Sequence, residues 1–306
     1  MIRYIGLRLL QAIVSLLVVM SLVFLLSRLS GDPVQLLADI SASDEQMDAL
    51  RHDLGLDRPL AIQWVTYVKD MITLDLGDSV VSRQPVRDLI MQRLPNTLQL
   101  GFAGMAISLL FGLPIGIYAA VNRGTRRDKA AQLFAVLGQS MPSFWLGVIL
   151  ILVFGVYLHV LPPGGKEGPN SIILPAFSLG YVTTAAVMRL TRSSMMDVLD
   201  AEYIKMARIK GLGETTVVWK HALKNALIPV ITFSVVLFTL FLGAAVVTET
   251  VFAWPGVGSL ILEGVRTRDY PLIQGGVVVF SAIFITANLA VDILYGYLDP
   301  RIRLAE

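Results

Sequence analysis

The sequence contains no cysteine and has few charged residues for its length. Without cysteine, the chain forms neither disulfide bonds nor thiolate metal sites. Charged residues make up 16% of the 306 positions, whereas roughly a quarter is usual in a soluble protein. Hydrophobic residues make up 55%. This composition predicts that the chain lies in a lipid bilayer.

The familiar motifs of catalysis are also missing. The sequence has no phosphate-binding loop of the form GxxxxGKS or GxxxxGKT, no Gly-x-Ser-x-Gly turn and no pair of histidine ligands on one helix. His52, His159 and His221 are too scattered for a metal cluster, and a net charge of +2 does not favour nucleic acid as a partner. We therefore expect no catalytic residue, no metal and no cofactor. The energy for any uphill transport must then come from a partner or an ion gradient.

The chain holds six apolar segments of bilayer length. The first, residues 9–27, is uncharged and follows Arg3 and Arg8, which predicts an uncleaved anchor helix with a cytoplasmic N-terminus. The others cover about residues 98–121, 131–158, 172–188, 226–248 and 273–295. The loop 122–129 is rich in arginine and should be cytoplasmic, whereas the loop 159–171, with a single lysine, should lie outside.

These assignments predict an all-α integral membrane protein with six transmembrane helices, divided into four parts. Residues 1–30 form an anchor helix, and residues 31–97 form a periplasmic helical cap. Residues 98–298 form a core of five spans, which includes the cytoplasmic loop 189–225. Residues 299–306 form a cytoplasmic tail, so that both termini lie in the cytoplasm.

The predicted cap is polar and contains helix start and stop signals. Ser43 and Gln46 make a capping box, and the helix that they start should stop at Gly55. Another helix should start at Pro85 and end before Pro95, because the residue before a proline disfavours the helical conformation. We interpret the cap as a small helical layer on the outer face of the membrane.

The loop 189–225 is the longest strongly polar segment between apolar spans in the second half of the chain. Residues 203–210 have helical composition, and Gly211 supplies a helix stop before a second helix over 214–224. Ala207 lies four residues before Gly211, so we expect both on one face that allows close approach. The residues alone favour two interpretations equally, a contact with another protein or a helix pair on lipid headgroups.

Ionisable residues are nearly absent from the middle of the spans. Glu249 lies at the outer end of the fifth, and Asp292 lies near the inner end of the sixth, on the same helix face as Asn288. We interpret Asn288 and Asp292 as helix-packing residues. Ion-coupled carriers place ionisable groups mid-membrane, so this scarcity argues against that class.

Several short motifs follow one another in a fixed order along essentially the whole chain. In the polar loop they are Glu202-Tyr203, Ala207-Arg208-Ile209-Lys210-Gly211-Leu212 and His221-Ala222-Leu223-Lys224-Asn225-Ala226-Leu227-Ile228-Pro229. Elsewhere they are Gly31-Asp32-Pro33, Leu54-Gly55-Leu56-Asp57-Arg58-Pro59-Leu60, Arg93-Leu94-Pro95, Leu174-Pro175-Ala176, residues 252–258, Arg268-Asp269-Tyr270-Pro271 and Asp299-Pro300-Arg301-Ile302-Arg303. Together they resemble the B-type permease subunit of the dipeptide, oligopeptide and nickel family of binding-protein-dependent ABC importers.

The general loop motif of such permeases is matched only in part. It reads Glu-Ala-Ala, three residues, Gly, nine residues and Ile-x-Leu-Pro. When the motif is aligned on Gly211, Ala207, Gly211 and Leu223 match it. This departure is the one associated with the peptide family. Roles that the general motif assigns to its Glu and Pro are not transferred to this chain, because it lacks both residues at those positions.

The resemblance implies a type I ABC importer fold in the bacterial inner membrane, with a helical periplasmic insertion between helices 1 and 2. It implies a second permease as heterodimer partner, one or two ABC ATPase subunits and a periplasmic solute-binding protein. The implied ATPase-coupling residues are Glu202, Tyr203, Lys205, Ala207, Arg208, Lys210, Gly211, Leu212, His221 and Asn225. The implied docking residues for the binding protein are Asp44, Glu45, Asp48 and Asp53.

The implied function is to form half of the pathway for di- and oligopeptides, with ATP hydrolysis in separate subunits. The same architecture could carry nickel, glutathione or an oligosaccharide instead. An ion-coupled secondary carrier and a membrane-embedded enzyme are the alternatives from other classes. Neighbouring genes for a second permease, ATPases and a secreted binding protein would favour the importer.

Overall fold

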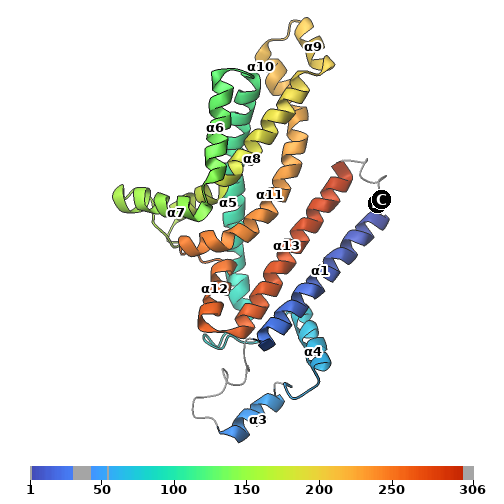
Figure 1. Ribbon diagram of the computed structural model, residues 1–306, viewed down its shortest axis with the longest axis vertical. Coiled ribbons are helices and arrows are strands. Elements are labelled where there is room, and N and C mark those ends of the chain that lie inside the picture. The colour runs from blue at the N-terminus through green and yellow to red at the C-terminus, as the bar shows by residue number, and fades with distance from the viewer. Residues whose placement is uncertain (1, 30–42, 54, 299–306) are drawn as a thin grey trace. The chain divides into compact units, whose positions relative to one another are not determined.

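The computed structural model describes residues 2–29, 43–53 and 55–298 (Figure 1). These residues form helices joined by turns, together with an isolated antiparallel bridge between Asp78 and Pro85. The predicted all-α class is therefore confirmed. The predicted tail 299–306 and the Gly31-Asp32-Pro33 motif lie outside the described residues.

Within the described residues, five helices are long and apolar enough to cross a bilayer, or six if one bent pair counts as a single span. The five are α1 (Ile2–Leu29), α5 (Val86–Val121), α8 (Ile173–Leu199), α11 (Leu223–Val251) and α13 (Tyr270–Leu298). The bent pair is α6 (Arg126–Ser140) and α7 (Ser143–Leu150), which the π-helical turn η1 (Ile151–Tyr157) extends. These elements follow the order of the six predicted apolar segments.

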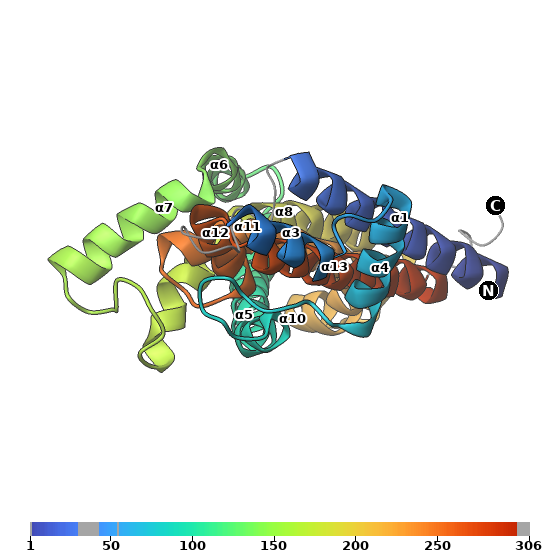
Figure 2. The ribbon, with the colours of Figure 1, turned by 90° about the horizontal axis from the view of Figure 1, so that it is seen from below.

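The third predicted span, 131–158, is not one straight helix. The chain bends by 95° between α6 and α7, and Figure 2 shows α7 pointing away from α6. Pro142 has no backbone N–H to continue the helix, and it disfavours the helical conformation of the residue before it. Met141 accordingly has φ −96° and ψ 126°, which is extended backbone. The proline breaks this span.

Helix α5 runs without a break through Pro95, so the predicted helix end before that residue is wrong. A proline inside a helix costs about 3 kcal/mol because one backbone hydrogen bond is lost. Burial on both sides of the proline offsets this cost, since Ile90 and Leu100 are both buried. The helix therefore joins the last helix of the predicted cap to the second predicted span.

The chain divides into two compact units, and the division falls inside α5. The first unit consists of Met1–Pro95 and Gly256–Glu306, and the second of Asn96–Pro255. In the first unit, α1 and α13 run side by side. Its core residues are Met20, Met71, Leu76, Val86, Ile90, Val257, Leu260, Leu272 and Val278.

Two shorter helices of the first unit pack against this pair. Helix α4 (Leu60–Thr73) contacts α1, and α12 (Val257–Thr267) contacts α13. The predicted capping box at α3 (Asp44–Asp53) is confirmed. The Ser43 N–H donates to Gln46 Oε1 over 2.9 Å, and the Gln46 N–H donates to Ser43 Oγ over 3.3 Å. The helix stop at Gly55 is also confirmed, with φ +63°.

In the second unit, α8 packs against α6, α7 and α11. Gly112 and Gly116 of α5 allow close helix approach, as their four-residue spacing predicts. A Cβ on Gly112 would lie 2.7 Å from Val187 Cγ1, and one on Gly116 would lie 2.7 Å from the Met188 carbonyl oxygen. These contacts leave no room for a larger side chain.

Candidate functional site

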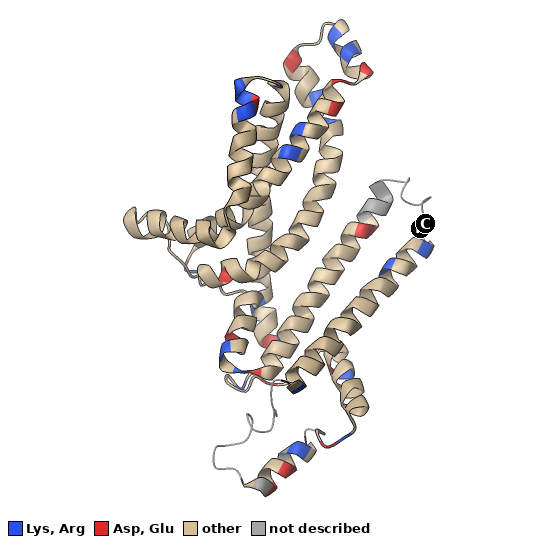
Figure 3. Ribbon diagram, in the orientation of Figure 1, with Lys and Arg blue, Asp and Glu red and all other residues tan. Residues whose placement is uncertain are grey.

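The segment that projects between α8 and α11 is shorter than the predicted loop 189–225. Helix α8 continues to Leu199, and the π-helical turn η3 (Val217–Ala222) leads directly into α11. Between them lie α9 (Glu202–Ile209), a turn and the short α10 (Glu214–Thr216), which we call the α9–α10 hairpin. Figure 3 shows charged residues gathered around this hairpin and the start of α6.

One face of α9 packs against the protein's own core. Ile204 is fully buried and Ala207 is 8% exposed. Both belong to an apolar cluster with residues of α5, α8, η3 and α11, among them Met195 and Val217. The close approach that Ala207 allows is therefore to the protein's own core, whereas Gly211 is exposed in the turn after α9.

The opposite face of α9 is apolar and exposed. Met206, Ile209 and Leu212 follow at intervals of three residues and are 53%, 78% and 39% exposed, and Tyr203 precedes them at 44%. A spacing of three places the helical side chains of Tyr203, Met206 and Ile209 on one face, and Leu212 follows them after the end of α9. We call these four residues the apolar row. Large apolar side chains on an otherwise charged hairpin are characteristic of a surface that contacts another protein or a membrane.

The turn after α9 depends on Gly211. Its φ of +79° lies in the left-handed region, which glycine adopts without steric cost. The Leu212 N–H donates to the Ala207 carbonyl over 3.3 Å, and the Gly211 N–H donates to the Arg208 carbonyl over 2.9 Å. This pair of bonds defines a Schellman motif, which ends the helix and places Leu212 in the apolar row.

Two polar contacts hold the hairpin in place. Arg208 donates from Nε and Nη2 to the two carboxylate oxygens of Glu214, over 2.7 and 3.3 Å, and joins α9 to α10. These hydrogen bonds raise the pKa of the Arg208 guanidinium above its usual range. Asn225 Nδ2 donates to the Tyr203 hydroxyl over 2.7 Å and joins α9 to α11. Three elements are thus connected, and of the four side chains involved Tyr203, Arg208 and Asn225 were predicted as coupling residues, whereas Glu214 was not.

The remaining predicted coupling residues lie in or near the α9–α10 hairpin. Glu202 and Lys205 form an exposed ion pair of 2.7 Å within α9. Lys210 is exposed in the turn, and His221 is half-buried in η3. The Glu202–Lys205 pair stabilises α9 by only about a few tenths of a kcal/mol, as is usual for exposed pairs three residues apart.

A buried ion pair that had not been predicted from the sequence joins α6 to α8. Asp128 is almost fully buried, and Arg192 of α8 donates to both of its oxygens over 2.7 and 2.8 Å. The Gln132 side chain and the Gly124 N–H also donate to Asp128. The signal that could have found it is Thr125 three residues before Asp128, a pattern typical of a helix start.

The other end of the second unit holds a cluster around Trp254, which is buried. Its indole N–H donates to the Asn96 carbonyl over 3.0 Å, and the Asn96 side chain donates to the Pro255 carbonyl over 2.7 Å. Lys166 donates to Asn96 Oδ1 over 2.6 Å and lies 5.5 Å from the Trp254 ring centre. The loop that contains Lys166 is thereby fixed to the start and end of the unit.

Near this cluster, Glu249 lies in the last turns of α11, in agreement with the predicted position at the end of the span. Its side chain is fully buried and accepts a hydrogen bond from the Thr97 hydroxyl over 2.6 Å. A buried carboxylate needs such partners to remain in an apolar environment. The pair joins α5 to α11.

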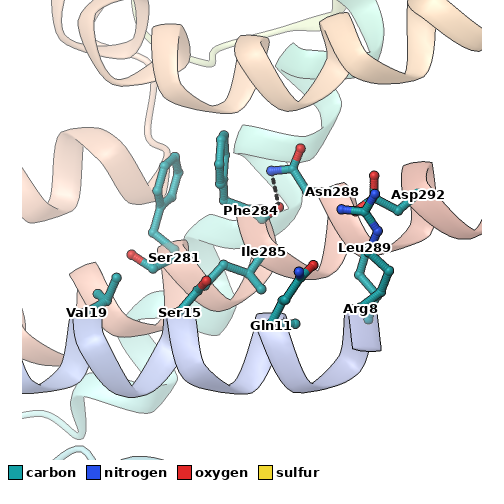
Figure 4. A pocket seen from close by; sticks show the side chains of 12 residues that line it. Arg8, Gln11, Ser15, Val19, Ser281, Phe284, Ile285, Asn288, Leu289 and Asp292 are labelled. Carbon is teal, nitrogen blue, oxygen red and sulfur yellow. Dashed lines mark hydrogen bonds and ion pairs between the residues drawn. The ribbon is translucent and has the colours of Figure 1, made fainter. Parts of the chain in front are cut away.

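A groove of about 480 Å³ lies between α1 and α13 (Figure 4). Its polar lining consists of Arg8, Gln11, Ser15, Ser281, Asn288 and Asp292. Arg8 Nη1 lies 3.3 Å from Asp292 Oδ2, and Asn288 donates to the Phe284 carbonyl over 3.1 Å. Asn288 and Asp292 thus face the same groove, as their spacing predicts. Polar side chains within a membrane span usually face protein or a water-filled cavity.

The acidic residues predicted to contact a binding protein all lie in α3. Glu45 and Asp48 are exposed, and Asp48 pairs with Arg51 over 2.8 Å. Asp44 and Asp53 mark the two ends of the same helix.

Comparisons with known proteins agree on one family. The family model "Binding-protein-dependent transport system inner membrane component" matches residues 112–304, and the model for the N-terminal part of such components matches residues 1–101. The glutathione transport system permease proteins GsiC of Escherichia coli O6:H1 and Salmonella choleraesuis are 44% identical over 304 residues, which is 99% of each chain.

Two solved structures share the fold. An inward-facing structure of the MetNI methionine ABC transporter matches with a TM-score of 0.57 at 17% identity, covering 70% of this chain and 98% of that one. An amino acid ABC transporter with histidines matches with a TM-score of 0.52 at 16% identity, covering 70% and 94%.

Proposed function

The chain belongs to the family of binding-protein-dependent transport system inner membrane components, and we propose that it is the B-type permease of an importer for short peptides. As a member of that family it is a multi-pass permease subunit of an ABC importer, in which ATP is hydrolysed by separate subunits. The proposal adds the substrate class, the orientation in the membrane and the surfaces that contact each partner.

The α9–α10 hairpin is the proposed contact site for the ATPase. The observation that carries this assignment is the apolar row, which is exposed while the opposite face of α9 is buried in the core. The apolar row would enter a cleft of the ATPase, and closure of two ATPases would displace α9. The Arg208–Glu214 and Tyr203–Asn225 contacts would pass this displacement on to α10 and α11.

We place the hairpin in the cytoplasm, together with both termini. The loop 122–129 is basic, and Arg123 there pairs with Asp200 beside α9 over 2.9 Å, so loop and hairpin lie on one side. Basic loops of this length remain in the cytoplasm. The Lys166 loop and the cap 31–97 would then lie in the periplasm. The acidic face of α3 would contact a solute-binding protein there.

The groove between α1 and α13 is the proposed contact for a second, homologous permease. Its amide and hydroxyl side chains lie in two apolar spans, where lipid could not satisfy them. Polar side chains of this kind join helices across interfaces in membranes. A helix of the second permease would supply polar partners in place of lipid and complete a heterodimer.

The substrate class is argued from the relatives. The GsiC proteins are described as glutathione transport permeases, and glutathione is itself a tripeptide. Di- and oligopeptides therefore fit the proposal, and nickel or an oligosaccharide would be carried by the same architecture with another binding protein.

The test is to purify the complex through a tag on this chain and to reconstitute it in liposomes. We expect an ATPase and a second permease to co-purify, and glutathione or a dipeptide to accumulate only with ATP and a loaded binding protein. A complex with a tagged Ile209→Asp chain serves as control. Accumulation driven by a proton or sodium gradient without ATP would overturn the proposal.

A further inference from the structure

Helix α4 has apolar surface on two faces, and only one of them is covered by protein. On the covered face, Met71 is buried and the Trp64 indole N–H donates to Ser21 Oγ of α1 over 3.1 Å. The ring of Tyr67 lies 5.5 Å from that of Phe24. The helix is therefore fixed to α1 along one side.

The exposed side of α4 divides into an apolar and a polar flank. Ala61, Val65 and Ile72 lie at spacings of four and seven residues, and the last two are 59% and 66% exposed. Thr66 and Thr73 directly follow Val65 and Ile72 in the chain and are also exposed. Ile62, which is 47% exposed, lies four residues before Thr66, so the polar flank also has one apolar side chain at its start. Neighbouring helical residues point about 100° apart, so the two flanks face different surroundings.

Helix α4 is attached to α1 at Ser21 and Phe24, so the position of these two residues along α1 gives the level of the attachment. Ser21 and Phe24 precede Arg28 by seven and four residues, which corresponds to about 10 and 6 Å along a helix. Around the same level, Leu22, Leu25 and Leu26 are more than half exposed on a helix that crosses the bilayer. Counted back from Arg28, the first charged residue after this apolar run, the attachment lies at a distance that matches the depth of about 5–10 Å that interfacial helices reach.

We propose that α4 is an interfacial membrane helix, with its apolar flank among the acyl chains of the outer leaflet and its polar flank toward water. Lys69 lies between the two flanks and is exposed, so its ammonium can reach the lipid phosphates while its stem lies along apolar surface. Trp64 and Tyr67 are aromatic residues of the type that gather at this interface.

This assignment rests on the proposed outer location of residues 31–97. It gives α4 a role in import, because it holds the cap against the membrane surface and so sets the height at which α3 meets a binding protein. The occupant of the apolar flank is lipid rather than a protein partner, since α4 is attached to an apolar span whose neighbouring Leu22, Leu25 and Leu26 are also exposed.

The absence of cysteine makes single-cysteine labelling a direct test. Val65→Cys, with Thr66→Cys as matched control and Glu45→Cys as a marker of sidedness, would be made in the full complex in liposomes. We expect a membrane-impermeant maleimide to label Glu45→Cys and Thr66→Cys from the outer side, and Val65→Cys at least about tenfold more slowly. A bimane at position 65 should be quenched by lipids brominated on the acyl chain.

Each other outcome has a distinct meaning. Equal labelling of positions 65 and 66, or no quenching by brominated lipid, would overturn the inference. Protection of position 65 that disappears when the second permease or the binding protein is left out would assign the flank to that protein instead. Labelling of position 45 only from the opposite side would overturn the proposed orientation, whereas the contrast between positions 65 and 66 would still test the lipid contact. Retention of the ATPase by each variant shows that it has folded.

Discussion

At the residue scale, Gly211 is needed for its backbone conformation rather than for space. Nothing lies within 4 Å of the position of a Cβ there, but φ is +79°. A β-branched residue in this conformation costs on the order of 1–2 kcal/mol. We expect Gly211→Val to reach the membrane at normal levels and to lose most ATPase co-purification, because the turn that orients Leu212 is strained.

Gly211→Asn is the matched control for this prediction. Asparagine adopts the left-handed conformation far more readily than valine, so this variant should retain the ATPase and transport. If both variants behave alike, the conformation of the turn is not what the coupling segment requires. If both transport normally, the α9–α10 hairpin is not the coupling element.

Ile209 is the most exposed member of the apolar row, so it tests the contact itself. Burying one large aliphatic side chain contributes about 1.5–3 kcal/mol, so Ile209→Asp should weaken ATPase binding on the order of tenfold to a hundredfold. Thr215→Asp, an exposed position of the same hairpin outside the row, should have little effect. Binding of purified ATPase to the permease pair in nanodiscs measures both, and equal affinities would contradict the proposed contact.

Ala207 shows what the sequence could and could not predict at this scale. The helix stop at Gly211 follows from glycine alone, and the structure agrees with it. Which face of α9 points outward depends on Met195 and Val217, which form the core against which α9 packs. Those contacts join segments that the sequence analysis treated as one solvated loop, so the inward position of Ala207 could not be predicted.

At the scale of elements, the Asp128–Arg192 pair joins α6 to α8 beside the hairpin. Removing one partner of a buried pair leaves an unpaired charge and costs about 3–5 kcal/mol. We expect Asp128→Ala to lower the thermal stability of the purified permease strongly. The double variant Asp128→Ala, Arg192→Leu should recover a large part of the loss, because it buries no charge.

The exposed Arg123–Asp200 pair provides the contrast, since such pairs contribute about 0–1 kcal/mol. Asp200→Ala should therefore change the unfolding temperature little. A thermal-shift measurement on the unchanged protein, Asp128→Ala, the double variant and Asp200→Ala gives the unfolding temperatures to compare. Equal losses for Asp128→Ala and the double variant would mean that the cost comes from packing rather than from the unpaired arginine.

Prolines illustrate why element boundaries were harder to predict than element types. Pro95 and Pro142 carry the same local signal, yet α5 continues through the first and the chain bends by 95° at the second. Around Pro95, buried residues on both sides of the proline offset the lost hydrogen bond, and the helix continues. The difference lies in packing between distant segments, which composition and spacing do not report.

At the scale of the whole molecule, the order of motifs predicted the family, and the match over 99% of the GsiC relatives agrees with it. The helical class and the apolar spans also follow from the sequence, because a bilayer permits few structures. The groove between α1 and α13 could not be predicted, since its polar residues come from the two ends of the chain. The orientation rests on charge bias alone.

The orientation of the chain in the membrane can be measured with reporter fusions. Loops rich in lysine and arginine stay in the cytoplasm, so reporter fusions at Arg126 and Glu214 should report cytoplasm, and fusions at Glu45 and Lys166 should report the outside. The Arg123–Asp200 contact places Arg126 and Glu214 on one side of their unit, so the fusions at these two residues must give the same answer. Alkaline phosphatase activity and green fluorescence, measured on the same fusion sites, give opposite readouts. An outside signal at Glu214 would remove the hairpin from any ATPase, and the whole coupling proposal would fail with it.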